Sequence, residues 1–254
     1  MRLDGKYVVL TGASSGIGRA LVPYLLKEGA FVLAVSRSIE ETMDITHARL
    51  WLKNIDLKNK KDIDALFEHA MECFGRIDVF IANAGFTYYE PFEALTYQKV
   101  QSILETNVSS VFYSAMRMKS INETRPFNFM VTSSAIARLP MPGFALYGAT
   151  KAAVDNFIQA ANLERVRKDH TFQVVFPVAT NTPFFKKADA QRPWPVQAPE
   201  KVARKMIKGL KRNKKAIHPF PLFKWVNRVC PFCFKPYLHK ERKKFLRSEI
   251  DKRS

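Results

Sequence analysis

The sequence predicts an α/β protein built on a doubly wound, parallel β-sheet. Six short apolar runs alternate along the chain with longer segments of helical periodicity. Strand–helix repetition of this kind indicates parallel strands joined by right-handed crossovers. The runs do not alternate polar with apolar residues, which is typical of strands covered by helices on both faces. A glycine-rich turn follows the first run directly, where the first crossover would begin.

The predicted elements fill most of the chain. The strands are expected at residues 7–10, 31–35, 50–55, 77–82, 127–132 and 172–176. The helices are expected at residues 17–27, 62–73, 97–120, 147–167 and 199–211. The stretch between Arg37 and Asp56 is short, which predicts a reduced helix there. One domain is expected over residues 1–215, followed by a C-terminal extension over residues 216–254.

Length and composition limit the class of protein. The chain has 254 residues, of which 47% are hydrophobic, enough for one large domain and too many for a disordered protein. Its three cysteines exclude a disulfide scaffold and suit a reducing compartment. No signal-peptide pattern follows Met1 and no apolar run is long enough to span a bilayer, so a cytoplasmic protein is expected.

The net charge of +18 is unusual and unevenly distributed. Residues 1–200 carry 23 Lys+Arg and 20 Asp+Glu, whereas residues 201–254 carry 18 Lys+Arg and 3 Asp+Glu. Such asymmetry predicts a nearly neutral body with a basic element that meets an anionic partner. A solvated tail that only aids solubility is the alternative.

The glycine-rich turn has the features of a phosphate-binding loop. The first strand continues into Thr11-Gly12-Ala13-Ser14-Ser15-Gly16-Ile17-Gly18, and a helix follows. Glycine lets the backbone approach a pyrophosphate, and the helix N-terminus offers free N–H groups. The turn therefore predicts a bound dinucleotide.

The residue after the second strand indicates which dinucleotide. A site that prefers NAD usually has an acid here for the ribose 2′-hydroxyl. This chain instead has Arg37, whose guanidinium suits a 2′-phosphate, so NADP(H) is predicted. Arg37 as an ordinary surface residue is the alternative.

Three residues form a candidate catalytic group. Tyr147 and Lys151 stand one turn apart on a predicted helix, and Ser134 follows the strand at 127–132. A phenol titrates near ~10, and a neighbouring ammonium favours the phenolate. The Ser134 hydroxyl lies where open α/β sheets bind ligands and could hold a carbonyl or alkoxide oxygen.

With these motifs the sequence resembles the short-chain dehydrogenase/reductase family, in the branch with a Tyr-x-x-x-Lys active site. The resemblance covers roughly residues 4–215 and implies a Rossmann fold. Further matching residues are Asp56 after the third strand, Asn83-Ala84-Gly85 after the fourth, Asn107 in the long helix, and Pro177 with Thr182 after the sixth strand. Val178 departs from the pattern, because the family usually has glycine there.

The resemblance implies an NADP-dependent oxidoreductase that interconverts a ketone or aldehyde with an alcohol. Tyr147 would exchange the proton of the substrate oxygen, and Lys151 would lower the tyrosine pKa and bind the nicotinamide ribose. Ser134 would orient the carbonyl, and Asn107 would support a water-linked proton relay. A catalytically minor NADP-binding or scaffold protein of the same family is the alternative.

The remaining implied contacts are with the cofactor. Asp56 and Leu57 would meet the adenine, and Thr182 would meet the nicotinamide carboxamide. The segment Asn83, Ala84 and Gly85 would line the dinucleotide site. No metal is expected, and a homodimer or homotetramer is usual in such families.

Two groups of large apolar residues point to the substrate. Phe184, Phe185 and Trp194 follow Thr182, and Leu139, Met141 and Phe144 follow Ser134. They predict a lipophilic carbonyl substrate, such as a lipid, a 3-oxoacyl compound or a steroid. Ordinary core packing of these side chains is the alternative.

The C-terminal extension combines aromatic and basic residues. An amphipathic helix is predicted between Pro221 and Pro231, with an apolar face of Leu222, Trp225, Val226, Val229 and Cys230. Aromatic and basic residues follow, namely Phe232, Phe234, Tyr237, Leu238, Lys240, Arg242, Lys243, Lys244, Phe245, Leu246, Arg247 and Ile250. This pattern suggests peripheral attachment to an anionic membrane.

Other roles for the extension stay open. The apolar stripe could pack on the body or across a dimer interface, and the basic surface could dock an acidic acyl-carrier protein. Nucleic-acid binding is not expected, because no recognised motif accompanies the charge. Cys230 and Cys233 are interpreted as apolar surface or acylation sites, since a zinc site or a redox pair would need further features.

Overall fold

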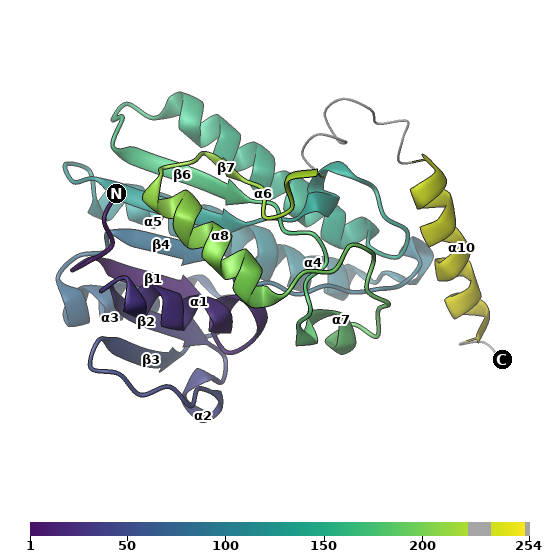
Figure 1. Ribbon diagram of the computed structural model, residues 1–254, viewed down its shortest axis with the longest axis horizontal. Helices are drawn as coiled ribbons and strands as arrows, with labels where there is room; N and C mark the ends of the chain where they lie inside the picture. The colour runs from purple at the N-terminus through teal and green to yellow at the C-terminus, as the bar shows by residue number, and fades with distance from the viewer. Residues whose placement is uncertain (223–234, 252–254) are drawn as a thin grey trace.

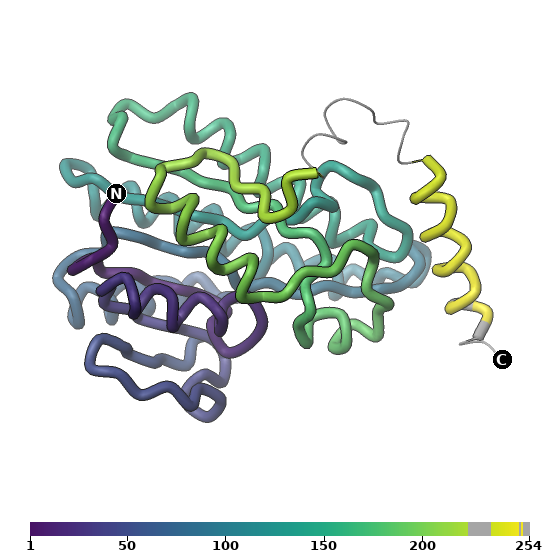
Figure 2. The backbone as a smooth tube through the Cα atoms, in the orientation of Figure 1, coloured from purple at the N-terminus to yellow at the C-terminus, as the bar shows by residue number. Residues whose placement is uncertain are grey.

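The computed structural model describes residues 1–222 and 235–251. Its centre is a seven-stranded parallel sheet in the order β3-β2-β1-β4-β5-β6-β7, which confirms the predicted doubly wound α/β class (Figure 1). The strands are β1 (Tyr7–Thr11), β2 (Phe31–Ser36), β3 (Leu50–Asn54), β4 (Val79–Ala82), β5 (Phe127–Thr132), β6 (His170–Val175) and β7 (Ala216–Ile217). The order reverses between β1 and β4, as Figure 2 shows along the chain path.

Helices cover both faces of the sheet. On one face α1 packs against α8, and on the other face lie α3, α5 and α6 (Figure 1). The α-helices are α1 (Gly16–Lys27), α2 (Ile39–Thr42), α3 (Lys60–Phe74), α4 (Tyr97–Leu104), α5 (Ser110–Ile121), α6 (Ala145–Glu164), α7 (Pro183–Lys187), α8 (Pro199–Lys211) and α10 (Lys235–Asp251). Short 3-10 helices are η1 (Phe92–Ala94) and η3 (Ala135–Arg138), and η2 (Glu105–Ser109) is a π-helix.

The two apolar cores explain why the strands show no polar alternation. Every residue of β4, β5 and β6 is buried. On one face the rings of Phe67, Phe80 and Phe129 stack with centroid distances of 5.4 and 5.5 Å. On the other face Leu21 of α1 and Met206 of α8 belong to one apolar cluster. Side chains of both strand faces are therefore removed from water, which favours continuous apolar runs.

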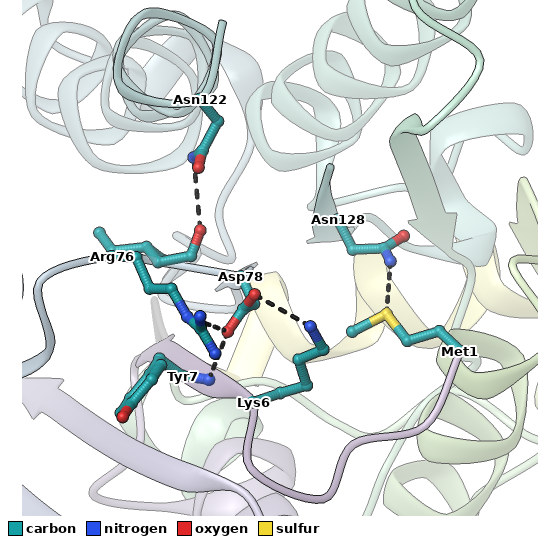
Figure 3. Close-up of polar contacts among 8 residues, drawn as sticks. Met1, Lys6, Tyr7, Arg76, Asp78, Asn122 and Asn128 are labelled. Atoms are coloured by element: carbon teal, nitrogen blue, oxygen red, sulfur yellow. Dashed lines mark hydrogen bonds and ion pairs between the residues drawn. The ribbon is translucent and has the colours of Figure 1, made fainter. Parts of the chain in front are cut away.

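A polar cluster connects the amino ends of the central strands through hydrogen bonds and ion pairs. Asp78 accepts hydrogen bonds from Lys6 Nζ at 3.2 Å and from the Tyr7 amide at 3.0 Å, and it pairs with Arg76 (Figure 3). Asn128 Nδ2 on β5 contacts the sulfur of Met1, in the segment that precedes β1 (Figure 3). These interactions join the segments at the amino ends of the strands, whereas the cavity described below lies at the carboxyl ends.

Three local features differ from the prediction or sharpen it. The short α2 confirms the reduced helix between the second and third strands. The long predicted helix at 97–120 is interrupted by the π-helix η2, which contains Asn107. Strand β7 was not predicted. It has two residues, and its register with β6 pairs Val174 with Ala216 and Val175 with Ile217, so the first residues after position 215 complete the sheet.

Part of the basic charge of the C-terminal fifth belongs to the folded body. Residues 201–215 carry eight of its Lys+Arg, and these belong to α8 and the turn after it, within the folded body. Most of the predicted amphipathic helix, including Trp225, lies outside the described residues, as do Cys230 and Cys233. In the described part of the chain, none of the helices combines the length and apolar character needed to cross a membrane.

Candidate active site

A cavity of about 840 Å³ opens at the carboxyl ends of the strands. Its walls come from the segments that follow six successive strands, at residues 12–17, 36–38, 55–58, 83–90, 132–136 and 177–182. One end is formed by the glycine-rich turn and Arg37, and the other end is formed by aromatic side chains. Tyr147 and Lys151 lie between the two ends and belong to the lining.

The glycine-rich turn lies directly against the segment after β4. Gly12 has a φ of +66°, and a Cβ at this position would lie 2.7 Å from the Ala84 Cα atom. Thr11 Oγ1 accepts hydrogen bonds from the amides of Asn83 and Ala84 at 3.0 and 3.1 Å. Asn83 Nδ2 in turn donates to the Gly12 carbonyl at 3.2 Å. Only glycine at position 12 permits this approach.

The same turn contacts the segment after β6. Gly16 has a φ of +56°, and a Cβ there would lie 2.9 Å from Thr182 Cγ2. A Cβ on Gly18 would lie 2.1 Å from the Gly12 carbonyl oxygen, so Gly18 packs behind the turn and does not line the cavity. The turn forms a cradle of bare backbone at the start of α1, and that cradle fits a pyrophosphate.

Most of the predicted cofactor residues meet in this one cavity. Its lining includes Gly12, Ser14, Ser15, Gly16, Ile17, Arg37, Asp56, Leu57, Asn83, Ala84, Gly85, Tyr147, Lys151 and Thr182. Arg37 is exposed, and within the described chain it makes no hydrogen bond or ion pair that would compete with a ligand. Lys58 lines the same end of the cavity and was missed, although its position two residues after Asp56 could have indicated it.

The side chain of Asn107 connects the π-helix to the backbone of the site. It is fully buried; its Nδ2 donates to the Phe86 carbonyl at 2.9 Å and its Oδ1 accepts from the Phe86 amide at 3.1 Å. A Cβ on Gly85 would lie 3.1 Å from Asn107 Oδ1 and 3.4 Å from Lys151 Nζ. The π-helical turn thus places an amide against the backbone beside Lys151, a common use of such turns at functional sites.

Tyr147 and Lys151 stand on the first turns of α6, near Ser134 at the end of β5. The Lys151 ammonium donates to the Thr132 carbonyl at 2.9 Å and lies 5.6 Å from the centroid of the Tyr147 ring. The Ser134 side chain lines the same cavity as Tyr147 and interacts with the phenol in the sense that lowers its pKa. The carbonyl of Thr132 was missed as a partner of Lys151, because a backbone group leaves no signal in the residue pattern.

The protonation of this group differs from the prediction. Burial raises the pKa of the Tyr147 phenol above its usual value, and the interaction with the Ser134 side chain opposes this only in part. Burial also lowers the pKa of Lys151 to about 8. The expected depression of the tyrosine pKa is not found, because the ammonium points to the Thr132 carbonyl and desolvation dominates. At neutral pH the phenol is therefore a protonated donor.

The other end of the cavity is apolar. The Tyr147 ring lies 5.3 Å from Phe184 and 6.4 Å from Phe144, and Phe185 lies 6.2 Å from Phe144. All six predicted substrate residues line the cavity, namely Leu139, Met141, Phe144, Phe184, Phe185 and Trp194. Tyr88, Tyr89, Ile136 and Tyr237 also line it and were missed. The position of Tyr88 and Tyr89 shortly after β4 could have indicated them.

Comparison with known proteins decides the family. The short chain dehydrogenase family model matches residues 6–193, which is most of the chain. The chain belongs to the short-chain dehydrogenase family. Among curated relatives, this short-chain dehydrogenase is 30% identical over 190 residues to 3beta-hydroxysteroid dehydrogenase 1 of Eggerthella lenta, covering 71% of this chain and 73% of the relative.

Solved structures share the fold of this short-chain dehydrogenase. A short-chain dehydrogenase/reductase of Burkholderia phymatum in complex with NAD matches with a TM-score of 0.82 and 19% identity, over 90% of this chain and 94% of that one. A short-chain dehydrogenase of Burkholderia cenocepacia in complex with NADP matches with a TM-score of 0.80 and 20% identity, over 94% and 99% of the two chains. The family and the Rossmann fold are confirmed.

Proposed function

We propose that this chain is an NADPH-dependent reductase of a lipophilic ketone or aldehyde. The observation that carries the proposal is the placement of the protonated Tyr147 phenol, in one cavity with Ser134 and beside Lys151, between a phosphate cradle and an aromatic chamber. The related hydroxysteroid dehydrogenase supports an apolar carbonyl compound as the substrate class. The intact set of Asn107, Ser134, Tyr147 and Lys151 favours an enzyme over a scaffold protein.

The residues of the chain would act on the carbonyl as follows. The hydroxyls of Ser134 and Tyr147 donate hydrogen bonds to the carbonyl oxygen, and Tyr147 transfers its proton as the alkoxide forms. The Lys151 ammonium stabilises the resulting phenolate. Asn107 holds the backbone at Phe86 in place and supports the return of a proton from water. A bound nicotinamide supplies the hydride, and the protein contributes placement and electrostatics.

A bound dinucleotide would be held by residues already in place. The backbone of the glycine-rich turn and the start of α1 would hold the pyrophosphate, and Asp56 with Leu57 would border the adenine. Arg37 supports NADPH over NADH, because the exposed guanidinium at the end of β2 can pair with a 2′-phosphate and no acid stands there for a 2′-hydroxyl.

A panel of carbonyl compounds tests the proposed function. Alkyl ketones, a 3-oxoacyl thioester and a ketosteroid are each offered with NADPH and then with NADH, and oxidation of the reduced cofactor is measured. We expect turnover of an apolar carbonyl with a preference for NADPH. NADPH binding without turnover of any compound would favour the alternative of a binding or scaffold protein.

We also propose that the outer face of α10 binds an anionic membrane surface. Lys240, Arg242, Lys243 and Arg247 are exposed there, next to Leu246 and Ile250, whose exposed fractions are 44% and 67%. Each basic residue near such a surface contributes roughly 1 kcal/mol. Basic residues beside exposed apolar side chains are typical of interfacial helices.

Vesicle sedimentation tests the membrane proposal. Replacement of Lys240, Lys243 and Arg247 by Glu should abolish binding to phosphatidylserine-containing vesicles and leave turnover of a small ketone unchanged. The same number of reversals at Lys201, Lys205 and Lys208 on α8 is the matched control, since these are exposed but have no exposed apolar neighbours on that helix. Equal loss in both variants, or no binding by the unmodified chain, would contradict the proposal.

Assembly into a homodimer or homotetramer and a cytoplasmic location stay predictions. Sedimentation equilibrium of the full chain measures the number of subunits in the assembly.

A further inference from the structure

The polar helix α10 presents an unusual inner face to the body. Tyr237, Glu241 and Phe245 are spaced by four residues, so they share one side of the helix. This side is partly buried, whereas Lys240, Arg242, Lys243 and Arg247 on the other side are exposed. Tyr237 and Leu238 of this helix pack against the apolar cluster of Leu139, Met141 and Phe144, and the Phe245 ring meets the Tyr89 ring. Figure 1 shows α10 at one end of the molecule.

Tyr237 is the residue of α10 that reaches the cavity itself. Its side chain is part of the cavity lining, and its hydroxyl donates to the Trp194 carbonyl at 2.9 Å. Tyr237 and Leu238 both pack against the Leu139, Met141 and Phe144 cluster. Burial raises the pKa of the Tyr237 phenol, which keeps it a neutral hydrogen-bond donor. This hydrogen bond connects α10 to the loop between α7 and α8, at the aromatic end of the cavity.

Phe245 supports a second wall of the same end. Its ring meets the Tyr89 ring edge-to-face with a centroid distance of 5.5 Å, and Tyr89 packs on Phe144 at 4.8 Å. Gly143 lies under this contact with a φ of +77°, and a Cβ there would lie 2.4 Å from Tyr89 and 2.9 Å from Phe245. The glycine therefore leaves the space in which both rings meet.

We propose that α10 is the outer wall of the substrate end, and that Tyr237 and Phe245 determine how large an apolar carbonyl compound the cavity accepts. The inference rests on the proposed function, because it names residues that select the substrate of that reaction. Tyr237 closes the end of the cavity directly, and Phe245 acts as a positioning residue by holding the Tyr89 ring. A long apolar chain gains this additional surface, whereas a small ketone bound near Tyr147 does not reach it.

Substrate size dependence in the full-length chain tests the inference. Phe245→Ala and Tyr237→Ala are compared with Leu246→Ala, a matched truncation on the exposed side of the same helix. With methyl decyl ketone we expect KM to rise about five- to tenfold in the first two variants, because each loses an aromatic contact. With butanone we expect kcat/KM to stay within about twofold of the unmodified enzyme. Leu246→Ala should leave both substrates unaffected.

A second measurement does not depend on turnover. Hydrogen exchange of the amides at residues 88–90 and 139–144 is followed in the unmodified chain, in Phe245→Ala and in Leu246→Ala. We expect faster exchange in both segments only for Phe245→Ala, since the covering ring is lost.

Tyr237→Phe removes the hydrogen bond to the Trp194 carbonyl but retains the ring, so it should restore most of the selectivity between the two ketones that Tyr237→Ala loses.

The outcomes separate the inference from the proposed function. Unchanged exchange together with an unchanged KM for the long ketone would overturn the role of α10, as would an equal loss for both ketones. If the unmodified chain reduces no ketone, the proposed function fails, and the exchange measurement alone then decides whether α10 covers this end of the cavity.

Discussion

The two ends of the cavity are built by different means. The dinucleotide end consists of backbone turns that directly follow strands, and glycines there bring the turns within contact of each other. The aromatic end consists of side chains from separate loops and from α10, and its contacts join residues far apart in the sequence, such as Tyr89 with Phe245. The first end has little freedom to vary, whereas the second can change its shape through single side chains.

This difference explains which features of the site could be predicted from the sequence. The turn at Gly12, the position of Arg37 and the pair Tyr147 and Lys151 are local patterns, and the structure places all of them in one cavity. The continuous apolar runs likewise predicted six of the seven strands, because helices cover both faces of the sheet. These features depend on residues that are neighbours along the chain.

The features that were missed depend on contacts distant in sequence. Strand β7 has two residues and is formed by its pairing with β6, which lies far from it in the sequence. The π-helical turn at Asn107 is stabilised by the backbone of Phe86, which no periodicity reveals. The protonated state of Tyr147 depends on how deeply it is buried and on where the Lys151 ammonium points. Tyr237 lies at the site because its hydroxyl donates a hydrogen bond to the Trp194 carbonyl, which is distant in the sequence.

The strongest way to disturb the chemistry between the two ends is to remove the Lys151 charge. Lys151→Met should lower kcat by about 10²-fold or more, because the phenolate loses its neighbouring cation.

In the unmodified enzyme, reduction should slow as the pH rises through about 8, since burial lowers the pKa of Lys151 to about 8 and the charged form is the active one.

The free energy of unfolding should also depend on the protonation of Lys151, but it should rise with pH where the rate of reduction falls. The unfolded chain binds the Lys151 proton more tightly than the folded one, so the free energy of unfolding should rise as the pH increases from about 8 toward the ordinary lysine value near 10.5. Chemical denaturation at several pH values measures this rise, and Lys151→Met should lack it. A variant with the same pH dependence as the unmodified chain would show that Lys151 is not buried as described.

The dinucleotide end is tested by two glycines that both have a positive φ of similar size. Gly12 and Gly75 have φ values of +66° and +69°, but a Cβ on Gly12 would meet Ala84 at 2.7 Å, whereas one on Gly75 has nothing within 4 Å. Gly75→Ala should cost about 1 kcal/mol of stability from backbone conformation alone. Gly12→Ala should cost more and should weaken NADPH binding at least about tenfold. Equal effects in denaturation and binding titrations would refute the close approach.

Cofactor preference is expected to be a smaller effect. Arg37→Ser should weaken NADPH binding about tenfold and leave NADH binding unchanged, since one charge-assisted contact with the 2′-phosphate is lost. Arg204→Ser on α8 removes one exposed positive charge elsewhere and serves as the control. Fluorescence titration with both cofactors measures the change. A parallel loss for NADH would show that Arg37 supports the fold of the site and does not read the phosphate.

The aromatic end should give the smallest effects, one side chain at a time. Phe185 is partly buried against Phe144, whereas the Trp194 side chain is 70% exposed. Phe185→Ala should therefore raise KM for a long ketone about fivefold, and Trp194→Ala should change it less than twofold. The reverse order would mean that the Trp194 ring closes over the bound substrate.

The role of Tyr147 is tested most sharply by removing one oxygen atom at the junction of the two ends of the cavity. Tyr147→Phe removes the proton donor and retains the ring that packs on Phe184. We expect a fall in kcat of at least about 10²-fold, with NADPH affinity and melting temperature unchanged. Tyr113→Phe, which removes a phenol hydroxyl bonded to Asp64, should keep full turnover. Undiminished turnover of Tyr147→Phe would contradict Tyr147 as the proton donor.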